Sequence, residues 1–166
     1  ESVGRDGKFG PPNYAAFLRQ ADGNGFVMRP QGYAYLAFSQ GAHGHPLAVK
    51  IQADPQFNFN AYAYQDGSGS FYVTLINKSY GDHAQRASVS LQLPSGTSSG
   101  IWRRMDLVQA GSDVAAKTGV QLGGAAVDPE GNWPGQWEKI EAPKSGNLTV
   151  EVPAASAGLL RFSQGE

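Results

Sequence analysis

Most side chains that could perform acid–base chemistry lie in predicted turns. Turn-forming carboxylates neighbour Gly, Ser, Asn or Pro, and seven of the 14 acidic residues do so: Asp6, Asp22, Asp66, Asp82, Asp113, Asp128 and Glu130. Asp106, Glu138 and Glu151 lie within strand patterns instead, and Glu151 falls on the outward phase of its strand. An acid–base pair needs one carboxyl group in an apolar pocket that raises its pKa, so we assign no catalytic residue to this chain.

Metal ligands are equally sparse. His43 and His45 are separated by one residue, and the third histidine, His83, follows in a separate polar loop. A metal site needs three or four ligands, so we predict solvent-exposed histidines in a connection. The segment 128–132 carries oxygen ligands around a glycine, but its spacing does not match a calcium loop and Pro129 indicates a turn. We therefore expect no metal and no cofactor.

Three tryptophans provide the remaining candidate chemistry. Flat aromatic faces stack on sugar rings, so Trp102, Trp133 and Trp137 would form a carbohydrate-binding surface if they were exposed. The other interpretation is that Trp133 and Trp137 hold a long loop against the edge of the domain.

Composition limits the classes of protein and partner. The chain has 166 residues, of which 40% are hydrophobic and 16% charged, so it can bury a core and is not a charge-rich disordered chain. A net charge of −1 makes nucleic acid and anionic membranes poor partners. The chain has no cysteine, so it forms no disulfide, and it lacks the ~20-residue apolar run of a membrane span. Because it begins at Glu1 in a Gly-rich stretch, we expect a piece of a longer protein.

One helix and a series of strands must position these residues. The pattern predicts a helix from Pro30 to Gln40 that is apolar on most of its circumference, because Tyr35 and Phe38 widen the stripe formed by Tyr33, Leu36 and Ala37. Residues 13–19 are compatible with one or two helical turns. From Pro46 onward the apolar period becomes two, which predicts strands.

The predicted strands indicate a mainly β protein. A first strand runs from residue 47 to 51, and residues 57–77 form a hairpin with a Gly-containing turn. Further strands are expected over 87–93, 100–108, 119–122, 137–140, 148–152 and 158–162. Short strands joined by turns favour an antiparallel two-sheet β-sandwich with Greek-key links, with a β-barrel as the alternative. We expect the following side chains to point inward: Phe57, Phe59, Phe71, Val73, Leu75, Val89, Leu91, Leu93, Val150, Val152 and Leu159.

Several stretches resemble a known family. MRPQGYAYLAFSQG (28–41), followed by PLAVKI (46–51), is similar to the last barrel helix and first following strand of glycoside hydrolase family 79, which contains β-glucuronidases and heparanase-like enzymes. The segments 62–64, 71–79, 119–128 and 148–162 look like the C-terminal β-sandwich of that family. The likeness spans nearly the whole chain.

The resemblance implies a domain organisation and a partner. Residues 1–45 would be the last loop and helix of a catalytic (β/α)8 barrel, and residues 46–166 the C-terminal β-sandwich. The family's two catalytic glutamates would lie upstream, so this chain alone is expected to be inactive. Asn13 and Tyr14 fall in a loop that would help to recognise the sugar carboxylate. The resemblance also favours a secreted or periplasmic location. Asn77 and Asn147 head two sequons, which matter only in a secreted eukaryotic protein.

The sequence is compatible with three functions, of which a structural or adhesion module is the third. The leading hypothesis is an accessory sandwich that buttresses the barrel of a retaining enzyme acting on β-glucuronides or glucuronate-containing glycans. The alternative is an autonomous carbohydrate-binding module that uses exposed tryptophans. If the helix belonged to a barrel, Tyr33, Tyr35, Leu36 and Phe38 could not all be buried by this chain. We would then expect an exposed apolar patch that is covered by another chain or drives association.

Overall fold

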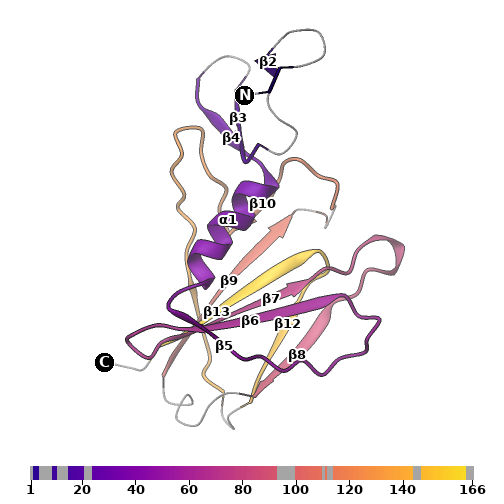
Figure 1. Ribbon diagram of the computed structural model, residues 1–166, viewed down its shortest axis with the longest axis vertical. Helices are drawn as coiled ribbons and strands as arrows, with labels where there is room; N and C mark the ends of the chain where they lie inside the picture. Colours follow the sequence, from indigo (N-terminus) through magenta and orange to yellow (C-terminus); the bar gives the residue numbers. More distant parts are fainter. Residues whose placement is uncertain are drawn as a thin grey trace.

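The computed structural model describes residues 2–3, 9–10, 15–20, 24–92, 100–109, 111, 114–143 and 147–163. Two layers of antiparallel strands lie on each other, with one helix on the far side of the larger layer (Figure 1). We call the larger layer the large sheet. Its strands are β5 (His45–Leu47), β6 (Phe59–Gln65), β7 (Phe71–Asn77), β9 (Ile101–Gln109), β10 (Val120–Leu122), β11 (Glu138–Ile140) and β13 (Ser156–Ser163).

The order of the large sheet is β10-β9-β13-β7-β6-β5, and β11 also pairs with β9. The small sheet consists of β8 (Ala87–Gln92) and β12 (Asn147–Val152). The chain therefore changes layer four times: between β7 and β8, between β8 and β9, between β11 and β12, and between β12 and β13. The N-terminal part adds two short hairpins, β1 (Ser2–Val3) with β2 (Phe9–Gly10) and β3 (Phe17–Arg19) with β4 (Phe26–Met28), and a 3-10 turn spans Gly81–His83.

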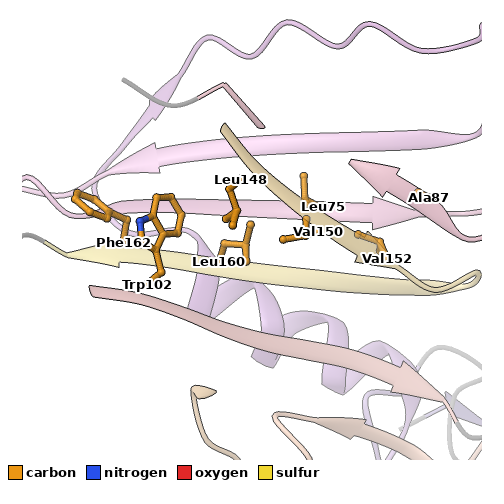
Figure 2. Packing of buried hydrophobic residues seen from close by; sticks show 8 residues of the cluster. All are labelled: Leu75, Ala87, Trp102, Leu148, Val150, Val152, Leu160 and Phe162. Atoms are coloured by element: carbon orange, nitrogen blue, oxygen red, sulfur yellow. The ribbon is translucent and has the colours of Figure 1, made fainter. Parts of the chain in front are cut away.

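The small sheet covers what we call the inner face of the large sheet. Strand β12 alternates exposed and buried residues, so its three apolar side chains point toward the large sheet. Figure 2 shows these side chains gathered with Leu75 of β7 and Leu160 of β13, whereas the helix lies on the other side of β13 from them. The inner core consists of Leu75, Ala87, Trp102, Leu148, Val150, Val152, Leu160 and Phe162. This arrangement confirms the mainly β, two-sheet sandwich.

The helix α1 (Pro30–Gly41) covers part of the outer face of the large sheet. Its predicted bounds are confirmed to within one residue, and Pro30 occupies the first turn as expected. Tyr33, Ala37 and Gly41, four residues apart, form its buried stripe. A Cβ at Gly41 would lie 2.6 Å from Thr74 Oγ1 in β7, so only glycine allows this end of the helix to approach the sheet so closely.

Two predicted elements are wrong. Residues 48–51 form no strand, because only His45–Leu47 pair with β6 and the chain then leaves the sheet. Phe17–Arg19 form the first strand of a hairpin with β4 rather than the end of a helical turn. In both segments the backbone conformation depends on pairing with a neighbouring strand. The local pattern of apolar residues does not reveal this pairing.

The predicted register is confirmed with one exception. Leu75, Val150 and Val152 are buried in the inner core, and Phe57, Phe59, Phe71, Val73, Val89 and Leu91 pack against it. Leu93 lies outside the described residues. Leu159 is also buried, but on the outer face, where it packs with Tyr33 and Met105. In β13 it is the next residue, Leu160, that points into the sandwich.

The turn between β6 and β7 is organised by one carboxylate. Oδ1 of Asp66 accepts hydrogen bonds from the Ser68 hydroxyl (2.7 Å) and from the backbone N–H groups of Ser68 (2.9 Å) and Ser70 (3.0 Å). Its Oδ2 accepts one from the Tyr72 hydroxyl at 3.1 Å. The Ser68 hydroxyl, more than the other donors, holds the pKa of Asp66 below its ordinary value of 3.8.

The inner core yields a stability prediction. Phe162 is about 1% exposed, and its ring centroid lies 5.0 Å from that of Trp102. Phe162→Ala leaves a cavity between the sheets, so we expect the free energy of unfolding to fall by about 3–5 kcal/mol in urea denaturation. The control is Phe26→Ala, at a ring that is 55% exposed, where a change of about 0.5 kcal/mol is expected. Equal losses in both variants would contradict the assigned core.

The Asp66 turn yields a prediction about pH. A carboxyl group whose pKa is lowered by folding stabilises the protein above its unfolded pKa, and this contribution disappears as the pH falls through the folded pKa. We therefore expect Asp66→Asn to be less stable than the parent at pH 7, with the difference shrinking below about pH 4. Urea denaturation of both proteins across this range tests it. A difference that does not vary with pH would show that the ionised carboxylate is unimportant.

Candidate functional site

The carboxylates predicted to lie in strands are either paired in a salt bridge or exposed to solvent. Asp106 forms a salt bridge with Arg104 at 2.9 Å, and Arg104 also donates a 2.7 Å hydrogen bond to the carbonyl of Glu151 in the small sheet. Glu138 and Glu151 are exposed. The two oxygens of Asp128 accept hydrogen bonds from the backbone N–H (2.7 Å) and the side-chain amide (2.9 Å) of Asn132, which confirms the predicted turn.

The histidines lie at the surface. His43 and His45 flank the end of α1 and the start of β5, and the His43 ring stands 4.7 Å from that of Tyr72. His83 is part of the 3-10 turn. Among the residues that the structure describes, no three His, Asp or Glu side chains are grouped as metal ligands.

The tryptophans serve packing. Trp102 is 1% exposed within the inner core, so its proposed role in stacking on sugars is wrong. Trp133 donates a 2.9 Å hydrogen bond from its indole N–H to the carbonyl of Leu122, and both Trp133 and Trp137 pack against the outer core. These contacts confirm that the two residues hold the loop between β10 and β11 against the sheet.

The remaining predicted site residues differ in their surroundings. Asn13 and Tyr14 lie outside the described residues. Asn77 is 1% exposed, and its side-chain amide donates to the carbonyls of Gln85 (2.8 Å) and Val152 (3.0 Å). Both amide hydrogens are therefore occupied in the folded protein, whereas Asn147 is exposed at the start of β12. Of the two sequons, only that of Asn147 is accessible.

An apolar groove of about 880 Å³ lies on the outer face of the large sheet. One wall is α1, the floor is formed by β6, β7 and the end of β9, and the segment 114–120 closes the other side. Its main apolar lining residues are Ala34, Ala37, Phe38, Tyr62, Ile76, Tyr80, Leu107, Val114 and Val120. We call this surface the outer groove.

Aromatic side chains along the outer groove are exposed to solvent. Phe38 is 64% exposed on α1, and Tyr80 and Val114 across the groove are exposed to a similar extent. Tyr35, one turn before Phe38, is 62% exposed. By contrast, Tyr33 is 4% exposed, and its hydroxyl accepts a 2.9 Å hydrogen bond from the N–H of Val127. The prediction that the helix cannot bury all its apolar residues within this chain is confirmed.

The chemistry available at the outer groove is that of an interface. Large exposed apolar surfaces typically mark contacts with another protein surface or a ligand. The apolar circumference of the helix predicted the helical part of this surface, but not Tyr62, Tyr80 and Val114. Tyr62 alternates along β6 with residues that point inward, so the period of two indicated that its side chain lies on the outer face. Tyr80 and Val114 lie outside strands, where no periodicity identifies them.

No helix among the described residues is both long and apolar enough to cross a membrane. A search of curated proteins gives no match.

Solved structures with a similar fold are parts of larger enzymes. A thermostable GH51 α-L-arabinofuranosidase from Thermotoga petrophila RKU-1 superposes with a TM-score of 0.64 at 11% sequence identity, over 83% of this chain. A GH30 endoxylanase from Clostridium papyrosolvens C71 gives a TM-score of 0.50 at 15% identity, over 82% of this chain. The chain spans only 30% and 28% of these structures. At such identities the likeness concerns the fold.

The sequence itself matches a family. Residues 61–159 match the family described as the glycosyl hydrolase family 79 C-terminal beta domain. The match begins in β6 and ends in β13, so it includes strands of both sheets and most of the inner core, with Leu160 and Phe162 just beyond its end. It covers more than half of the chain, as the resemblance of its strands to that family predicts. The chain therefore belongs to the C-terminal β domains of glycosyl hydrolase family 79.

Proposed function

We propose that this domain buttresses the catalytic (β/α)8 barrel of a retaining glycoside hydrolase, and that α1 and the outer groove form the contact with the barrel. Residues 1–45 would then be the last loop and helix of the barrel, and residues 46–166 the accessory sandwich. The observation that carries this proposal is the exposure of Tyr35 and Phe38 on a helix whose other side is buried against the sheet.

The position of the helix supports a second layer on its exposed side. A helix that is apolar all round normally lies between two packed layers. Here the large sheet supplies one layer, through Leu159 and Met105 among others. The matched structures are about three times as long as the aligned region, so chains with this fold carry additional polypeptide that could supply the other.

The proposed substrate class is β-glucuronides or glucuronate-containing glycans. It rests on the resemblance to glycosyl hydrolase family 79. The family match supports this resemblance for the C-terminal β domain. In a retaining enzyme, two carboxyl groups about 5–5.5 Å apart perform the reaction. We expect both to belong to the barrel. Asn13 and Tyr14 would lie at the active-site face, where the loops that follow the barrel strands converge.

An activity assay tests the division of labour. We expect this chain alone to leave an aryl β-glucuronide intact, and the polypeptide that also contains the barrel to hydrolyse it. Turnover by the 166 residues alone would show that the sandwich is itself catalytic and would contradict the proposal.

Substitution of the exposed helix residues tests the contact. In Tyr35→Ser/Phe38→Ser both changes are at exposed positions, so the sandwich should remain folded. Affinity for the separately expressed remainder of the barrel, without residues 1–45, should fall at least about tenfold, as for aromatic anchors of an interface. The matched control is Ile51→Ser, which is 46% exposed away from α1 and should have no effect. Unchanged affinity in the double variant would place the contact elsewhere.

A further inference from the structure

The register of the large sheet brings three cations together on the outer face, beyond the end of α1. Lys139 of β11 lies opposite Arg103 of β9, and Arg103 lies opposite Arg161 of β13. The next residue in the same line is Tyr72 of β7. We call Lys139, Arg103 and Arg161 the cation row.

The neighbouring residues fix the face on which this row lies. Side chains alternate along a strand, so residues two positions apart share a face. Met105 and Leu159, two positions from Arg103 and Arg161, belong to the outer core beneath α1. The cation row is therefore on the same face, and Arg103 and Lys139 are exposed there.

This arrangement is electrostatically unfavourable without a partner. Neighbouring strands are about 4.8 Å apart, and like charges directly opposite each other destabilise a sheet. Within the described residues none of the three cations forms an ion pair, and the salt bridge of Arg104 lies on the inner face. The chain as a whole has a net charge of −1, so the row is a local concentration of charge rather than a sign of a basic protein.

Arg161, at the Tyr72 end of the row, is held in place but incompletely hydrogen-bonded. Its guanidinium carbon lies 5.5 Å from the centre of the Tyr72 ring, a cation–π contact. Tyr72 is fixed by its hydrogen bond to Asp66 and by the His43 ring beside it. The Nε atom of Arg161 is buried and has no hydrogen-bond partner among the described residues. The row thus combines a positioned guanidinium with unpaired donors.

The ligand that would relieve the repulsion carries several negative groups in a line. Guanidinium groups bind carboxylates and sulfates in a fork-like geometry. Tyr64 of β6, directly opposite Tyr72, continues the line at the rim of the outer groove, which it also lines, with a half-buried aromatic ring suited to a sugar face. From these observations and the membership in a glycoside hydrolase family, we propose that the cation row binds an acidic saccharide chain through its carboxylate or sulfate groups. This inference does not require contact between the domain and a barrel.

Binding measurements with three polymers test the inference. We expect the chain to bind polygalacturonate, which carries carboxylates, or dextran sulfate, or both, and not neutral dextran. Affinity should fall as the salt concentration rises. Which of the two anionic polymers binds identifies the group that is recognised. Failure of both to bind, or equal binding of dextran, would overturn the proposal, whereas loss of glucuronidase activity in the full enzyme would bear only on the proposed function.

A pair of charge-matched variants makes the test specific. Arg103→Gln/Lys139→Gln should weaken binding about tenfold, while the Tm stays equal to that of the parent or rises because the repulsion is removed. Lys50→Gln/Lys117→Gln removes two exposed charges that are not in the row and should leave the affinity unchanged. Should the first variant unfold, Lys139→Gln alone, at an exposed position, should still weaken binding about threefold. Equal weakening in both double variants would show that only overall charge matters, which contradicts a site.

Discussion

The burial of β13 on both faces is the constraint on which the rest of this structure depends. Ala157, Gly158, Leu159 and Leu160 are all buried, and the strand pairs with β7 on one side and β9 on the other. Every backbone group in such a strand is satisfied by its neighbours, but its side chains need apolar cover above and below. The small sheet provides cover for Leu160, and α1 provides it for Leu159.

The small sheet covers the inner face of the large sheet more completely than α1 covers the outer face. On the inner face, β8 and β12 pair along six residues and enclose a core with two aromatic rings in contact. On the outer face a single helix, supported by the loop that carries Trp133 and Trp137, shields only part of the sheet. The helix is itself apolar on its second side, so the outer groove and the exposed aromatic residues follow directly from how this face is covered. The same incompleteness leaves Arg103 and Lys139 exposed beyond the helix.

Much of this fold could be predicted from the sequence, because apolar periodicity reports which side chains share a face. It located α1 and placed Leu75, Val150 and Val152 in the core. Apolar periodicity does not work for β13, because both faces of this strand are buried and a continuous apolar run does not show which residues share a face. The prediction that Leu159 points into the sandwich is therefore wrong, since it points to the outer face. The burial of Trp102 could not be predicted, because sequence does not reveal how deep a strand lies within a sheet.

The candidate surfaces were less predictable than the fold. The exposed part of α1 followed from its apolar circumference, whereas Tyr80 and Val114 reach the groove from irregular segments. The cation row depends on the pairing of β11, β9 and β13, which are separated by long stretches of chain. Which residues face each other across strands is set by register, and register is a property of the assembled sheet.

Hydrogen–deuterium exchange tests the central claim most directly. It should be measured on this chain alone and on the polypeptide that also contains the barrel. The account predicts that the amides of β13 exchange slowly in both, because the two covers of this strand belong to the chain, and that those of α1 become markedly slower only when the barrel is present. If α1 is as well protected in the chain alone as with the barrel, its exposed face is not an interface and the account is contradicted.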